Sequence, residues 1–108
     1  MQFLTLTHRH TDSFPHAEFT ARVEEEVEQA RVLYGQGFIR QIWHRGDVEG
    51  ACILVEADSE AHVRERLSTL PLFQAGMLKV SIIPLKPYAG FRSRKPSRYH
   101  VPQDGASR

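Results

Sequence analysis

An acidic run on the first expected helix contains the residue best suited to proton transfer. At about 100° per residue, the apolar residues between positions 19 and 34 form one stripe, and Glu26 falls inside it. A carboxylate that faces an apolar interior is hard to ionise, so its pKa rises towards the range of a general base. The alternative places Glu26 at the edge of the stripe, in solvent or paired with Arg22 one turn earlier. The stripe consists of Phe19, Val23, Val27, Ala30, Leu33 and Tyr34.

A second group of polar side chains lies on an expected strand at residues 38–44. Alternation places Arg40 and His44 on one face of this strand and Trp43 on the other. The guanidinium of Arg40 could hold a carboxylate or an enolate oxygen with two hydrogen bonds, and His44 could transfer protons near neutral pH. The alternative for both is an ion pair at a sheet edge or dimer interface, with Glu56 as a candidate partner. For Trp43 the alternative is packing in the core or at an interface.

The other reactive residue types indicate neither a metal site nor nucleic-acid binding. His8 and His10 could share a strand face, but no cysteine or aspartate stands at a ligand spacing from them, so we expect no metal. Cys52 is expected to be a small buried side chain rather than a nucleophile. The strand expected at residues 51–57 offers no aromatic side chain on which RNA bases could stack.

Length and composition set the scale on which these residues must be positioned. With 108 residues and a formal net charge of +1, the chain is expected to form one domain without overall attraction to nucleic acid or membranes. It has no apolar run of membrane-spanning length and no signal-peptide pattern, and its single cysteine suits a reducing cytoplasm. The domain is expected to cover residues 1–90. Residues 91–108 are basic and poor in apolar side chains, which predicts a flexible tail.

Six expected elements carry the candidate residues, in the order β-α-β-β-α-β. β-branched and aromatic runs predict the strands, and apolar spacings of three and four predict the helices. The strands cover 2–8, 38–44, 51–57 and 78–85, and the helices run from a cap at Asp12 or Ser13 to Tyr34 and from a cap at Asp58-Ser59 to a stop at Pro71. This order predicts an α+β, ferredoxin-like fold, in which a four-stranded antiparallel sheet carries two helices on one face.

The other face of such a sheet has no helix over it. Alternation directs Phe38 and Ile42 to one side of the second strand and Ile39 and Trp43 to the other, so both faces carry apolar side chains. A large apolar surface open to water indicates an interface. We therefore expect the bare faces of two subunits to pack together in a homodimer or a larger homo-oligomer.

Four short motifs resemble those of the muconolactone Δ-isomerase family, over residues 18–87. They are Leu70-Pro71-Leu72-Phe73 after the second helix, Gly37-x-x-Arg40-x-x-Trp43 entering the second strand, Glu25-Glu26-x-Glu28 with Ala30 and Leu33 on the first helix, and Pro87 at the domain end. The resemblance implies a dimeric α+β barrel, often assembled into larger rings, that works without metal or organic cofactor. It also implies a reaction in aromatic catabolism that shifts a C=C bond in an unsaturated lactone bearing a carboxymethyl group.

The resemblance also implies roles for individual residues. Glu26 would be the base that takes the γ-proton and returns it at the α-carbon, and His44 an auxiliary acid or base. Arg40 would hold the anion, and Trp43 would form a wall or an interface. Phe73 and Lys86 would complete the set of substrate-binding residues. The partner would be a small anionic molecule.

Three departures from the family pattern concern the substrate rather than the fold. Gln74-Ala75-Gly76 follows the Leu-Pro-Leu-Phe motif where the family usually has proline and an aromatic residue. Lys86 replaces the histidine of a His-Pro pair, and His44 replaces an arginine after the tryptophan. Two other hypotheses therefore stay open: a non-catalytic barrel that binds a small ligand or only assembles, and a cofactor-free monooxygenase of the same architecture.

Overall fold

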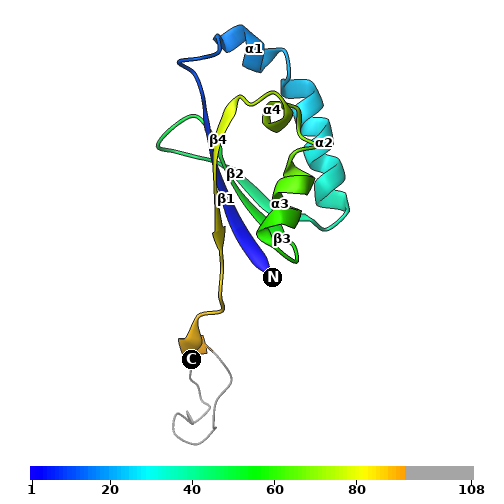
Figure 1. The fold of residues 1–108 in the computed structure, drawn as a ribbon, viewed down its shortest axis with the longest axis vertical. Coiled ribbons are helices and arrows are strands. Elements are labelled where there is room, and N and C mark those ends of the chain that lie inside the picture. Colours follow the sequence, from blue (N-terminus) through cyan, green and yellow to red (C-terminus); the bar gives the residue numbers. More distant parts are fainter. Residues whose placement is uncertain (92–108) are drawn as a thin grey trace, which may run out of the picture.

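The structure, a computed structural model, describes residues 1–91 (Figure 1). Four strands form one antiparallel sheet in the order β2-β3-β1-β4, and α2, α3 and α4 lie against one of its faces. The elements are β1 (Gln2–Arg9), α1 (His16–Thr20), α2 (Val23–Gly35), β2 (Ile39–His44), β3 (Ala51–Glu56), α3 (Glu60–Leu67), α4 (Pro71–Gln74), β4 (Leu78–Pro84) and the 3-10 turn η1 (Ala89–Phe91). This arrangement confirms the expected ferredoxin-like α+β fold. The predicted tail lies outside the described residues except for Phe91.

The main core lies between the sheet and the helices α2 and α3. Alternate residues of each strand point into it, since successive side chains of a strand face opposite ways. Buried strand residues meet buried residues of α2, α3 and the segment after α3; the cluster comprises Phe3, Leu33, Phe38, Ile39, Ile53, Val55, Ala57, Val63, Leu67 and Leu70. Ser59 caps α3 as predicted, because its hydroxyl oxygen accepts the backbone N–H of His62 at 3.1 Å. Among the described residues, no helix is long and apolar enough to cross a membrane.

Two helix boundaries differ from the sequence-based expectation. The first helix is interrupted at Ala21 and Arg22, so that α1 and α2 are separate. This break allows Phe19 to pack with Leu72 and Met77 in a second buried cluster, while Leu33 joins the main core. Pro71 does not end the second helix, which already stops at Leu67. It begins α4 instead, because the first position of a helix needs no backbone N–H.

A β-bulge in β2 changes which side chains share a face. The pairing with β3 shifts between Ile39 and Gln41. Ile39 therefore lies opposite Val55 and Ile42 opposite Ile53, both on the helix side of the sheet. The expectation that Ile39 and Ile42 point to opposite faces was wrong, since the extra residue at the bulge reverses the alternation beyond it. Trp43 lies opposite Cys52 on the other face, as expected.

The side of the sheet away from the helices has an apolar area, here called the open face, and the polar residues His8, Ser81 and Lys79 lie on the same side. Leu4 lies at its centre, flanked by Leu54 of β3 and Ile83 of β4. The open face consists of Leu4, Leu6, Trp43, Cys52, Leu54 and Ile83. Ile83 and Trp43 are 41% and 49% exposed. An apolar surface of this kind on one side of a sheet is typical of an interface.

The connection between β2 and β3 is held close to β1 at Gly50. A Cβ atom at Gly50 would lie 1.9 Å from the carbonyl oxygen of Thr7. The next residue is tied to the same strand, since the N–H of Ala51 donates to the hydroxyl of Thr7 at 2.8 Å. Only glycine allows this close approach.

We expect Gly50→Ala to destabilise the protein by about 1–3 kcal/mol, because the added methyl group forces the connection away from β1. Urea unfolding followed by circular dichroism measures this change. Gly46→Ala, in the same connection, is the matched control: nothing lies within 4 Å of its Cβ position, and we expect a change within about 0.5 kcal/mol. Equal stability of the two variants would contradict the close contact.

Candidate active site

A cavity of about 750 Å³ lies between α2, α4 and the sheet. Its apolar lining includes Val23 and Val27 of α2, which are 40% and 43% exposed, and Ile42 of β2. The predicted apolar stripe of the first helix therefore lines a cavity over much of its length instead of packing fully in the core. This volume is within the range of sites that bind small molecules. Polar groups enter it from α2, β1, β2 and the β2–β3 connection.

Glu26 of α2 contributes a carboxylate to this cavity and is half-buried. Its Oε1 accepts the backbone N–H of Leu72 at 2.9 Å. Burial raises the pKa of Glu26, although the Leu72 N–H and the positive charge of Arg9 oppose the increase. The alternative pairing with Arg22 does not form, because Arg22 binds Glu18 at 3.0 Å. Glu26 thus combines the raised pKa and the fixed orientation that a general base needs.

The Leu70-Pro71-Leu72-Phe73 segment explains how Glu26 is held. Pro71 is the first residue of α4 and Leu72 the second. Backbone N–H groups in the first turn of a helix have no partner within that helix, so the Leu72 N–H is free to bind a side chain. Phe73 lines the cavity beside it. The segment therefore both orients the carboxylate and forms part of the wall.

Three arginines that were not selected from the sequence also line the cavity: Arg9, Arg45 and Arg31. The side chain of Arg31 is 74% exposed, and it lies 3.7 Å from the carboxylate of Glu28. Arg9, the last residue of β1, lies with its guanidinium 5.0 Å from the ring centre of Phe19, and its Nη1 is 3.6 Å from Oε1 of Glu49. It is near enough to Glu26 to lower the pKa of that carboxyl. Arg9 lies on the helix side because it shares the alternation of Thr5 and Thr7, both buried. That alternation was the signal in the sequence that could have identified it.

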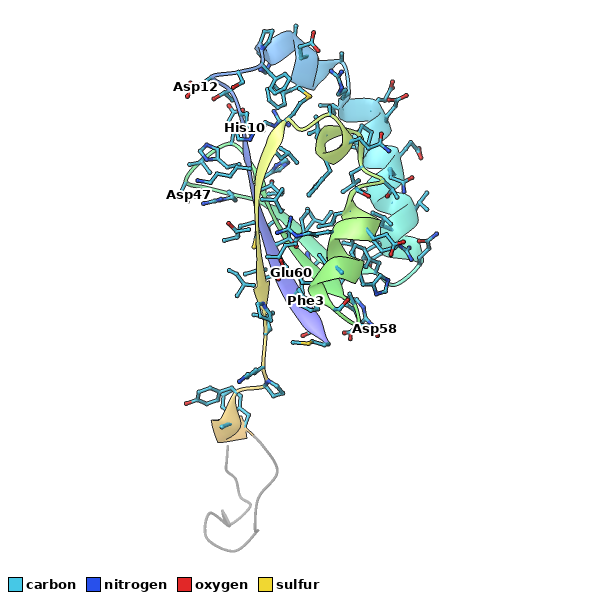
Figure 2. All side chains as sticks on the ribbon, in the orientation of Figure 1. Phe3, His10, Asp12, Asp47, Asp58 and Glu60 are labelled. Carbon is cyan, nitrogen blue, oxygen red and sulfur yellow. The ribbon has the colours of Figure 1, made fainter. Side chains whose placement is uncertain are left out.

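Arg45 begins the β2–β3 connection and is held by two groups. Its Nε and Nη2 donate to the carboxylate of Asp47 at 3.0 and 2.7 Å, and its Nη1 donates to the carbonyl of Thr7 at 3.3 Å. The hydrogen bonds from Arg45 to the Asp47 carboxylate are the main cause that lowers the pKa of Asp47 to about 2. Figure 2 shows Asp47 on the connection, which projects from the sheet away from α3. No pattern in the sequence marks these contacts, since they depend on how the connection folds back to β1.

Together these groups suit the abstraction of a proton from carbon. A half-buried carboxylate can take the proton, and nearby guanidinium groups can stabilise the negative charge that develops. His44 lines the same cavity and can exchange a proton. Among residues 1–91, no three side chains of the metal-binding types gather at one point.

The comparison with protein families identifies the family of this chain. A model of the family described as muconolactone delta-isomerase matches residues 1–90. The chain belongs to the muconolactone delta-isomerase family. The resemblance inferred from the four motifs is thereby confirmed. In this family member, the Leu-Pro-Leu-Phe motif lies beside Glu26, because the N–H of Leu72 donates to the Glu26 carboxylate.

A solved structure supports the fold of this muconolactone delta-isomerase family member. The 5-chloro-2-hydroxyhydroquinone dehydrochlorinase TftG from Burkholderia phenoliruptrix AC1100, in complex with 2,5-dihydroxybenzoquinone, superimposes with a TM-score of 0.61. Its sequence is 17% identical, and the match covers 83% of this chain and 98% of that one. At this identity the likeness establishes a shared fold. The search of curated proteins found no match to the sequence.

The residues selected from the sequence separate into two groups. Glu26, His44 and Phe73 line the cavity, whereas Arg40, Trp43 and Lys86 are not among its lining residues in this subunit. Arg40 occupies the bulge, where its Nε donates to the carbonyl of Gly37 at 2.9 Å. The candidate partner Glu56 accepts a hydrogen bond from the amino terminus of Met1, which is the main cause that lowers the pKa of Glu56, and the charge of Arg40 makes a smaller contribution. Arg40 therefore does not line the cavity, although it lies on the same strand as His44. A substrate contact for Arg40, Trp43 or Lys86 stays a prediction.

Proposed function

We propose that the protein is an isomerase that transfers a proton within a small, carboxylated, unsaturated lactone or a similar anion, in the catabolism of aromatic compounds. The observation that carries the proposal is the half-buried Glu26 carboxylate, which is oriented by the Leu72 N–H in a cavity that also holds Arg9. Membership of the muconolactone delta-isomerase family supports the choice of substrate class.

The proposed reaction has two proton transfers. Glu26 takes the proton from the γ-carbon of the lactone, and the C–H electrons form a new double bond between the β- and γ-carbons. The electrons of the original α,β double bond move to the bond between the α-carbon and the carbonyl carbon, and the carbonyl oxygen takes the negative charge of the resulting dienolate. The protonated Glu26, whose proton can exchange with solvent, then delivers a proton to the α-carbon, which restores the carboxylate and the carbonyl. Arg45 and His44 lie on the cavity wall, where a charge or a hydrogen bond can stabilise the dienolate oxygen.

Proton NMR of the protein with muconolactone in D₂O tests this function. We expect migration of the double bond together with deuterium incorporation at the α-carbon, because the abstracted proton exchanges with solvent. Exchange at the γ-carbon without migration would mean that the base acts but the substrate is a different anion. Absence of both signals would contradict the proposed isomerisation and favour a barrel that binds a ligand without transforming it.

We also propose that two subunits pair through their open faces. Leu4, Leu6 and Leu54 occupy the middle of this face, and the more exposed Trp43 and Ile83 lie towards its edges. Pairing would remove all of these side chains from water, which is the main favourable contribution to most protein association. The cavity lies on the opposite side of the sheet, so pairing leaves its lining unchanged.

A further inference from the structure

Arg9 differs from Arg45 in how much of its hydrogen-bonding capacity is already used. The side-chain nitrogens of Arg45 donate three hydrogen bonds, to Asp47 and Thr7. Among the described residues, the guanidinium of Arg9 makes no hydrogen bond, and its ion pair with Glu49 is long at 3.6 Å. A guanidinium has five N–H donors in a planar fork that matches a carboxylate. Arg9 therefore has the larger unused capacity for an anion in the cavity.

The position of Arg9 is suited to this use. Its side chain is only 25% exposed, and the ring of Phe19 lies 5.0 Å from its Cζ, which supports the guanidinium plane through cation–π attraction. Arg9 is also one of the residues that line the cavity. Glu26 is close enough to feel its charge. An anionic group bound to Arg9 would thus hold the rest of a small molecule beside the carboxylate of Glu26.

Glu49 is the only partner of Arg9 among the ion pairs of residues 1–91, and it is replaceable. Its side chain is 64% exposed, compared with 25% for Arg9, so Glu49 can turn into water while Arg9 stays in the wall. A long ion pair with one solvated member contributes little stability. A ligand carboxylate that forms two short hydrogen bonds with the same guanidinium would bind more strongly.

We propose that Arg9 binds the carboxylate of the substrate, and that Glu49 occupies Arg9 when the cavity is empty. The proposal rests on the proposed function in taking this cavity as the active site, and it adds the residue that selects a carboxylated ligand. It also assigns opposite effects to the two partners. Loss of Arg9 removes the attraction for the ligand, whereas loss of the Glu49 charge removes its competitor.

Binding of an unreactive ligand tests this assignment without any turnover. Isothermal titration calorimetry would compare (5-oxooxolan-2-yl)acetate, a saturated carboxymethyl lactone, with its uncharged methyl ester. For the wild-type protein we expect the carboxylate to bind at least tenfold more tightly than the ester. Arg9→Met should weaken carboxylate binding by about ten- to a hundredfold, as expected for charge-assisted hydrogen bonds, and leave ester binding nearly unchanged. Glu49→Gln should strengthen carboxylate binding by about two- to fivefold.

Matched variants separate this effect from general changes in charge. Arg64 and Glu60 form an ion pair at 3.3 Å on α3, away from the cavity, so Arg64→Met and Glu60→Gln should leave both affinities unchanged. Arg9→Lys keeps the charge but loses the planar fork, and we expect intermediate affinity. Arg9→Met keeps only apolar packing on Phe19. If this variant does not fold, Arg9→Lys tests the assignment in its place.

Three results would overturn the assignment: equal binding of carboxylate and ester by the wild-type protein, an unchanged preference in both Arg9 variants, or weaker binding by Glu49→Gln. Failure of the proposed isomerisation looks different. In that case muconolactone would undergo neither exchange nor migration in D₂O, while the binding of the saturated carboxylate would still depend on Arg9.

Discussion

Replacement of Glu26 with glutamine is expected to lower kcat for lactone isomerisation by about 10²- to 10⁴-fold, the usual contribution of a positioned general base. The amide cannot accept the γ-proton, but its oxygen can still accept the N–H of Leu72, which bonds to Oε1 in the wild-type protein. Affinity for an unreactive carboxylate should therefore change little. Initial rates followed by ultraviolet absorbance or NMR give the measurement, and a variant with normal turnover would exclude Glu26 as the base.

The stability of the Glu26→Gln variant provides its control. Because the pKa of Glu26 is raised in the folded protein, its contribution to stability is complete below the pKa of the unfolded chain and is lost as the pH rises through the folded pKa. At pH 7, ionisation of this carboxylate is therefore less favourable in the folded protein than in the unfolded chain. We expect the glutamine variant to melt at the same temperature as the wild type or higher at pH 7, which separates loss of catalysis from loss of structure.

The pH dependence of the wild-type enzyme follows from the same shift. Proton abstraction needs the ionised form of Glu26, so kcat/KM should fall as the pH decreases through its pKa, with the midpoint above the ordinary glutamate value of 4.5. The other charged or titratable groups that line the cavity are Arg9, Arg31, Tyr34, His44, Arg45 and Glu49. In Glu26→Gln this limb should disappear from the residual rate. Its persistence would assign the titration to another of these groups.

Introduction of a charge on the open face is expected to convert the proposed dimer into monomers. Ile83 is 41% exposed in the single subunit, so Ile83→Lys can keep its charge in water when the subunit is alone. In the proposed dimer the same ammonium group would be desolvated against apolar side chains, which is strongly unfavourable. Sedimentation velocity or light scattering should give half the wild-type mass, and Trp43→Lys should act in the same way.

Val32→Lys is the matched control for the dimer. Val32 lies on α2 and is 47% exposed, close to the value for Ile83, but it is not part of the open face. This variant should keep the wild-type mass. If Ile83→Lys and Trp43→Lys also keep it, the subunits do not associate through the open face.

The sequence predicted the elements and the central carboxylate because both depend on local patterns. Alternation and three-to-four spacing located the strands and helices, and the same helical spacing placed Glu26 within the apolar stripe. Three features depend on contacts between distant segments and were missed. The break at Ala21 and Arg22 and the bulge at Arg40 have no glycine or proline signal of their own. The contacts of Arg45 depend on how the β2–β3 connection folds back onto Thr7. The position of Arg9 follows from the alternation of β1, which places it on the same side as the buried Thr5 and Thr7.

The alternation of β1 has a consequence for how this protein can vary. Thr7 and Arg9 line the cavity, whereas Leu4 and Leu6 belong to the open face, so neighbouring positions of one strand serve separate tasks. Mutations in the two sets should combine nearly additively where their side chains share no contact. A library that randomises only Thr7 and Arg9 would vary ligand contacts and leave the proposed interface unchanged, and one restricted to Leu4 and Leu6 would vary the proposed interface and leave the cavity unchanged. In β2 the two sets exchange parity at the bulge, so a one-residue deletion there would mix them.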